Sequence, residues 1–108
     1  MTDTTSKSLV QQMIGDTVPK LADLSDQVLN GDVWERTAEL AGRDRSLIAI
    51  ASLITSGSFE QLVGHIQKGK ANGLTEAEIT EAITHLAFYA GWPKAMSAVA
   101  VVQKTFGN

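Results

Sequence analysis

The sequence predicts an all-α protein, a single-domain bundle of about six helices. Apolar residues recur at helical spacing along most of the chain, and no segment shows the period-two alternation of a strand between turn signals. A chain of 108 residues can bury one hydrophobic core but not two. No linker or tandem repeat interrupts it, so we expect residues 1–108 to form one domain, with the polar residues 1–5 disordered.

Two helices and a shorter segment are predicted in the first part of the chain. Residues 8–14 place apolar side chains at i, i+1, i+4 and i+5, which indicates a helix face. After a break, residues 19–29 repeat the pattern from a proline in the first turn, and Asn30-Gly31 predicts the stop. Residues 32–40, DVWERTAEL, are either a short helix or an irregular docking segment.

The most apolar segment predicts a central helix. Residues 46–55 are apolar on nearly all sides, which is unusual for a helix at the surface. Ser58 and Gln61 then have the spacing of a capping box, in which two side chains three positions apart bond backbone N–H groups at a helix start. The helix that follows is predicted to end at Asn72-Gly73.

A second capping box predicts the next helix. Thr75 and Glu78 have the required spacing, and the apolar stripe behind them runs on to Gly91, which is expected to close the helix. Pro93 then stands where a proline is tolerated in the first turn of a final helix. The last apolar stripe reaches Phe106, so helices account for the remainder of the chain.

Composition excludes several classes of function. The chain has no cysteine, which removes disulfides and thiolate metal sites. Two histidines without a metal-binding spacing, and no glycine-rich phosphate loop, lead us to expect no metal and no cofactor. A net charge of −3 does not favour nucleic acid as a partner. With no apolar run of about 18 residues and no signal peptide, we expect no membrane association and a cytoplasmic location.

One stretch carries a family resemblance. Residues 43–98 include Ser58-Phe-Glu-Gln61-Leu-Val-Gly-His65 and, further on, Tyr89-Ala-Gly-Trp-Pro. These motifs resemble the carboxymuconolactone decarboxylase family, whose fold is shared with alkylhydroperoxidase D-like disulfide reductases. The redox branch has Cys-x-x-Cys-x-x-x-His where this chain has Ser58, Gln61 and His65, and a glutamate where it has Ser46. Thiol-dependent peroxide chemistry through this motif is therefore excluded.

The resemblance implies that His65 lies in an active-site pocket. A neutral imidazole has a pKa near about 6.5 and can both give and receive protons in the cytoplasm. Gln61 lies one turn before it on the same helix face and can hydrogen-bond there. Taken without the resemblance, His65 is a hydrogen-bonded helix histidine and Gln61 the partner in a capping box.

Other residues are candidates for binding the substrate. Arg43 and Arg45 precede the central helix and suit a carboxylate, although at i and i+2 they do not share a helix face. A solvated helix start or an intersubunit ion pair explains them equally well. Asp44 between them is either a helix cap or a partner of one arginine.

Ser58, Tyr89 and Trp92 complete the set of predicted substrate-binding residues. For Ser58 the favoured interpretation is capping, because a nucleophilic serine needs a base within hydrogen-bond reach. Tyr89 and Trp92, with His85 nearby, form either the wall of a pocket or an aromatic cluster in the core or a subunit interface.

The resemblance implies a cofactor-free carboxy-lyase that acts on a small carboxylate or lactone, with His65 in proton transfer. The alternative is a non-catalytic helical oligomer that binds a small molecule, and an alkylhydroperoxidase-type antioxidant is opposed by the missing cysteines. Because the apolar surface exceeds what one small bundle conceals, and related proteins assemble as trimers or hexamers, we expect a homo-oligomer.

Overall fold

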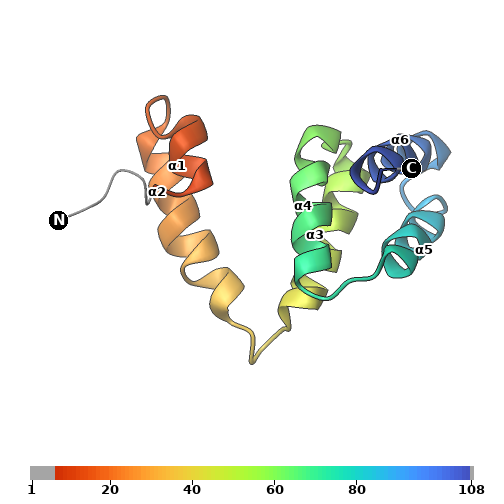
Figure 1. Ribbon diagram of the computed structural model, residues 1–108, viewed down its shortest axis with the longest axis horizontal. Helices are drawn as coiled ribbons and strands as arrows, with labels where there is room; N and C mark the ends of the chain where they lie inside the picture. Colours follow the sequence, from red (N-terminus) through yellow and green to blue (C-terminus); the bar gives the residue numbers. More distant parts are fainter. Residues whose placement is uncertain (1–6, 108) are drawn as a thin grey trace. The chain divides into compact units, whose positions relative to one another are not determined.

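Every regular element within residues 7–107, the part of the chain that the computed structural model describes, is helical (Figure 1). This range holds six α-helices, one π-helical segment and one 3-10 turn, so the prediction of an all-α fold with about six helices is confirmed. The expected disorder of residues 1–5 concerns residues outside that range. The chain divides into two units, one ending at Leu40 and the other beginning at Ala41.

The first unit consists of short helices. Helix α1 spans Leu9–Ile14 and is capped by the Ser8 hydroxyl, which accepts a hydrogen bond from the Gln11 amide at 3.0 Å. Helix α2, Pro19–Leu24, starts with the predicted proline and continues as the π-helix η2, Ser25–Asn30. The 3-10 turn η3, Val33–Glu35, is all that forms of the short helix considered for residues 32–40.

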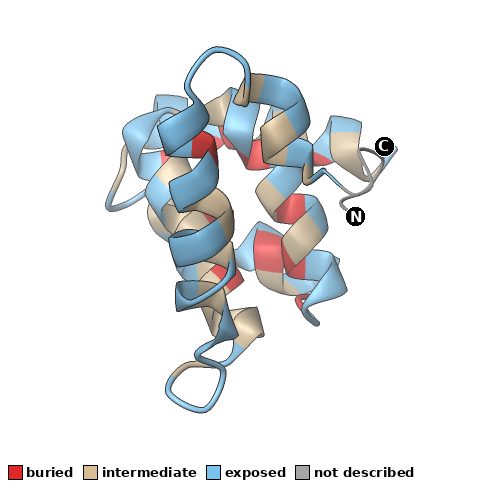
Figure 2. Cartoon of the chain, turned by 90° about the vertical axis from the view of Figure 1, so that its left-hand side faces the viewer, coloured by how far each residue is buried: buried red, intermediate tan, exposed pale blue. Residues whose placement is uncertain are grey.

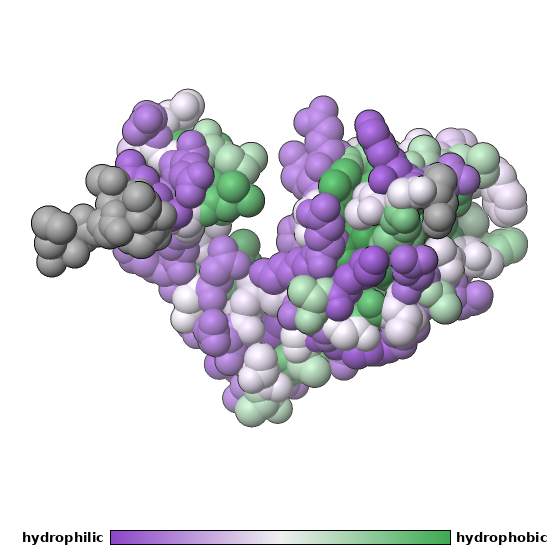
Figure 3. All heavy atoms as spheres, viewed as in Figure 1, coloured by the Kyte–Doolittle hydropathy of each residue, from purple (hydrophilic) through white to green (hydrophobic). Residues whose placement is uncertain are grey.

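This first unit buries little of its own apolar surface. Of its described residues only Ala22 is buried, and apolar side chains of α1, α2 and η2 line a groove of about 550 Å³. Figure 3 shows hydrophobic side chains gathered along one side of the unit. Burial of apolar side chains within residues 7–40 therefore contributes little to the stability of this unit.

The second unit is built from four longer helices. Helix α3 spans Gly42–Ser56, α4 Phe59–Ala71, α5 Glu76–Leu86 and α6 Trp92–Thr105. The turn between α3 and α4 uses Gly57 with φ of 76°, a left-handed conformation that favours glycine. Asn72 caps the end of α4 as predicted, whereas α5 ends at Leu86, five residues before Gly91.

Helix α3 is central to this unit and packs against α4, α5 and α6. It begins at Gly42, four residues before the start predicted at Ser46, and its first turn includes Arg43 and Asp44. An acidic side chain in the first turn of a helix interacts favourably with the helix dipole. Helix α3 is not enclosed on all sides, since Ile48 is 59% exposed.

One core joins the four helices (Figure 2). Each helix contributes residues at helical spacing, so that a single stripe of each helix is buried. The fully or almost fully buried apolar side chains of this core are Ile50, Ile54, Leu62, Ile66, Leu74, Ile79, Ile83, Ala95, Ala98 and Val102.

Helices α3 and α4 approach closely at Gly69. A Cβ atom at this buried position would lie 2.9 Å from Leu74 Cδ1 and 3.2 Å from Ile50 Cδ1, so glycine leaves room for both side chains. By contrast, a Cβ atom at the exposed Gly64 on the same helix would meet nothing within 4 Å.

We predict that Gly69→Val lowers the free energy of unfolding by about 1–3 kcal/mol, because its methyl groups overpack the core at this contact. Gly64→Val is the matched control and should change stability by less than about 0.5 kcal/mol. Urea denaturation of the two variants measures the difference. Equal stabilities would contradict the close approach at Gly69.

Candidate functional site

His65 lies in the middle of α4, between the fully buried Leu62 and Ile66. Its side chain is partly buried, and its Nδ1 atom is inaccessible to solvent. Burial, together with the positive charge of Lys68 one turn further along the helix, holds the pKa of His65 below 6.5. The ring is therefore neutral at neutral pH.

Lys68 was not among the predicted site residues. It is partly buried, and that burial lowers the pKa of its ammonium group. Its position three residues after His65 is the signal that sequence reasoning could have used, because residues at i and i+3 are neighbours on a helix surface. A histidine beside a lysine is suited to an anionic ligand.

The predicted capping role of Ser58 is wrong. Ser58 precedes α4, but its side chain makes no capping hydrogen bond, and its hydroxyl lies 2.8 Å from the hydroxyl of Ser56. The two serines bond each other across the turn, which removes Ser58 from the backbone N–H groups of the helix. Gln61, the other member of the proposed box, is exposed on the same helix as His65.

Ser46, where redox relatives place a glutamate, is fully buried. Its hydroxyl accepts a hydrogen bond from Asn72 Nδ2 at 3.0 Å, and the same amide lies 3.5 Å from the carbonyl oxygen of Gly42. Asn72 thus ties the end of α4 to the start of α3. Ser46 therefore helps to hold the end of α4 against the start of α3.

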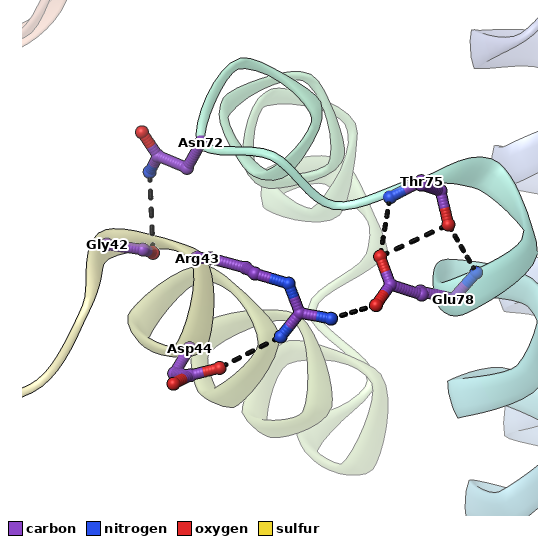
Figure 4. Close-up of polar contacts among 6 residues, drawn as sticks. All are labelled: Gly42, Arg43, Asp44, Asn72, Thr75 and Glu78. Carbon is purple, nitrogen blue, oxygen red and sulfur yellow. Dashed lines mark hydrogen bonds and ion pairs between the residues drawn. The ribbon is translucent and has the colours of Figure 1, made fainter.

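Arg43 joins α3 to α5 (Figure 4). Its guanidinium group donates to Asp44, at 3.0 Å, and to Glu78 of α5. The second carboxylate oxygen of Glu78 accepts from the backbone N–H of Thr75 at 2.9 Å and from its hydroxyl at 3.1 Å. The capping box of Thr75 and Glu78 is therefore confirmed, and it is also one half of an interhelical ion pair.

A groove of about 460 Å³ lies between α3 and α5, next to this ion pair. Its polar residues are Arg43, Glu78, Glu81 and His85, and its apolar wall consists of Leu47, Ala51, Ala82 and Leu86. Arg43 and His85 thus line the same groove. His65 is not among its lining residues.

The aromatic residues of the α5–α6 segment lie at the surface. Tyr89 is 77% exposed and packs against His85, with ring centroids 4.8 Å apart. Trp92, at the start of α6, meets the 80% exposed Phe88 edge to face, at 6.5 Å between centroids. Trp92 lines an apolar groove of about 300 Å³ between α5 and α6.

Comparison with known proteins places the chain in a family. The model of the carboxymuconolactone decarboxylase family matches residues 19–104, which is most of the chain. The chain belongs to the carboxymuconolactone decarboxylase family. The resemblance seen in residues 43–98 is thereby confirmed, and the all-α fold agrees with it.

Two curated relatives match most of the chain. A nitrosuccinic acid decarboxylase of Metarhizium robertsii is 37% identical over 78 residues, which cover 72% of this chain and 54% of that protein. A 4-carboxymuconolactone decarboxylase of Acinetobacter baylyi is 36% identical over 76 residues, covering 70% of this chain and 56% of the relative. The match spans about half the length of each relative.

Among residues 7–107, the part of the chain that the structure describes, no helix is both long enough and apolar enough to cross a bilayer.

We predict that Glu78→Ala lowers the free energy of unfolding by about 1–2 kcal/mol, since it removes the carboxylate's half of the capping box and the ion pair with Arg43. Glu78→Gln keeps an acceptor for Thr75 and should lose less. Glu81→Ala, on the same helix, is the matched control and should stay within about 0.5 kcal/mol of the unaltered protein. Thermal unfolding measures the order of the three variants, and an equal loss for Glu78 and Glu81 would refute the double role.

Proposed function

We propose that this protein is a cofactor-free decarboxylase that acts on a small carboxylate or lactone, with His65 in proton transfer. The supporting observation is the family match over residues 19–104, together with two relatives that are both named decarboxylases. His65 stands at the position of the family motif that carries the histidine, and its ring is partly buried beside a cationic side chain.

The proposed reaction needs an electron sink and a proton donor. When the bond to the carboxylate breaks, carbon dioxide leaves and the electron pair moves toward a neighbouring carbonyl group, which becomes an enolate, or toward the nitro group of nitrosuccinate, which becomes a nitronate. A proton then returns to the carbon. No external electron sink is required, so the protein must bind the acid, strip water from its carboxylate and stabilise the enolate oxygen.

In this mechanism His65 supplies the proton after taking one up from solvent. Its lowered pKa makes the imidazolium form scarce at neutral pH but a stronger acid than an ordinary histidine. Lys68 is the cation that we assign to the leaving carboxylate, because its charge already acts on His65. Gln61 is assigned to the enolate oxygen, since its amide can donate one turn away from His65.

The other residues predicted to bind the substrate lie in different surroundings. Arg43 already binds Asp44 and Glu78, so a substrate carboxylate at Arg43 would approach two carboxylates that are already bonded to it. Arg45 is partly buried in the first turn of α3 and stays a candidate for the same task. Ser58, Tyr89 and Trp92 stay predicted substrate contacts on the edges of α4, α5 and α6.

We predict that His65→Ala lowers kcat for decarboxylation by about 100-fold or more, the usual effect of losing a general acid. Release of carbon dioxide from 4-carboxymuconolactone and from nitrosuccinate is the measurement. Because the active form is protonated, the rate should fall as the pH rises through the lowered pKa of His65. Gln67→Ala, at an exposed position on the same helix, serves as the control and should retain activity.

Full turnover by His65→Ala would contradict the assignment of His65. No turnover of either compound by the unaltered protein would favour the alternative, a non-catalytic helical oligomer that binds a small molecule. A rate that rises with pH would show that His65 accepts a proton and does not donate one.

We also propose a homo-oligomer, trimeric or hexameric. It is supported by large apolar side chains at the surface of α5 and α6, including Phe88, Trp92 and Met96, which are all more than half exposed. Light scattering at micromolar protein should report at least three chains per particle. A monomer at that concentration would contradict the proposal.

A further inference from the structure

We infer that the groove between α3 and α5 is a binding site for a small organic cation, an ammonium group carried on an apolar body. This inference goes beyond the decarboxylase proposal and does not depend on it. It concerns a different set of side chains from His65 and Lys68, and a ligand of opposite charge.

The shape of the groove fits a small molecule. Its volume of about 460 Å³ lies within the range of about 300–1,000 Å³ that is usual for ligand sites. Leu47 and Ala51 are one turn apart on α3, and Ala82 and Leu86 are one turn apart on α5. These two short rows present an apolar wall from each helix, which suits a ring or a short alkyl chain.

The charged side chains at one end of the groove disfavour an anionic ligand. The single positive charge of Arg43 is shared between Asp44 and Glu78, so this network carries a net charge of −1 at neutral pH. Both oxygens of Glu78 are used, one by Arg43 and one by Thr75 (Figure 4). A carboxylate entering here would meet an excess of negative charge.

Glu81 adds a second, available carboxylate. It follows Glu78 by three residues on α5 and lines the groove, and its carboxylate makes no hydrogen bond or ion pair with any residue that the structure describes. An ammonium group at this point would gain a charge-assisted hydrogen bond, which is stronger than one between neutral groups. The groove thus offers one acceptor that is not yet used within the described part of the chain.

His85 supplies the neighbouring acceptor. It lies four residues after Glu81, on the same face of α5, and its ring packs against Tyr89 at 4.8 Å between centroids. A neutral imidazole has one nitrogen that accepts a hydrogen bond, and an ammonium group has several N–H donors. Glu81 and His85 can therefore bind one ammonium group together, while the apolar wall contacts its body.

The test uses three probes of the same shape: benzylamine, benzyl alcohol and benzoate. Each is titrated at neutral pH into the full-length, 15N-labelled protein, and amide chemical shifts report where it binds. Benzylamine should give saturable shifts in residues 43–51 and 78–86. Benzyl alcohol should bind about tenfold more weakly, and benzoate more weakly still, because each lacks the ammonium charge.

Two variants separate charge from shape. Glu81→Gln keeps the size of the side chain and should weaken benzylamine binding about tenfold without affecting benzyl alcohol. The matched control Glu76→Gln lies on the same helix, pairs with Lys70, lines a different groove, and should bind benzylamine normally. Ala51→Leu places a larger side chain in the groove and should weaken the binding of both benzylamine and benzyl alcohol.

Equal binding of benzylamine and benzyl alcohol would overturn the inference, and so would shifts that map outside the groove. An unchanged affinity in Glu81→Gln would overturn it as well, provided that the spectrum of the variant shows the native fold. Decarboxylase activity is not a readout in this experiment, so failure of the proposed function leaves its result intact.

Discussion

The carboxylate of Glu78 joins the starts of helices α3 and α5 in the four-helix unit. One oxygen caps the start of α5 through Thr75, and the other binds Arg43 on α3. Both contacts come from one side chain, so the start of α5 is fixed against the start of α3. The groove between these helices owes its polar end to this arrangement, because Arg43 and Glu78 both line it.

Charge divides the unit into two regions of different character. The α3–α5 groove contains two glutamates and an arginine that is already paired, whereas His65 lies close to the positive charge of Lys68. Anionic and cationic ligands therefore favour different regions. This separation is the physical reason for assigning the substrate carboxylate to α4 and the organic cation to the groove.

Local patterns predicted most of the helices, because the signals that start and stop a helix act over a few residues. Thr75, Asn72 and Pro93 each have the predicted place in the structure. The capping hydrogen bond predicted for Ser58 does not form, since its hydroxyl pairs with that of Ser56, a contact that the spacing of a capping box does not reveal. The ion pair of Arg43 with Glu78 spans 35 positions, and no local pattern could have predicted it.

The predicted site residues show the same limit. The resemblance singled out His65, and its lowered pKa depends on the depth of the ring in the fold, which helical spacing alone does not determine. Glu81 was overlooked because a charged residue on an amphipathic helix is usually solvated. Its role depends on α3 lying opposite, a feature of tertiary packing.

The proposed chemistry requires His65 to be a partly buried imidazole next to a place where an anion can bind. Its pKa can be measured directly by NMR titration of the 15N-labelled ring, with and without a saturating dicarboxylate such as succinate. We expect a pKa below 6.5 in the free protein and a rise when the dicarboxylate binds beside the ring. An ordinary pKa that succinate leaves unchanged would rule out this role of His65.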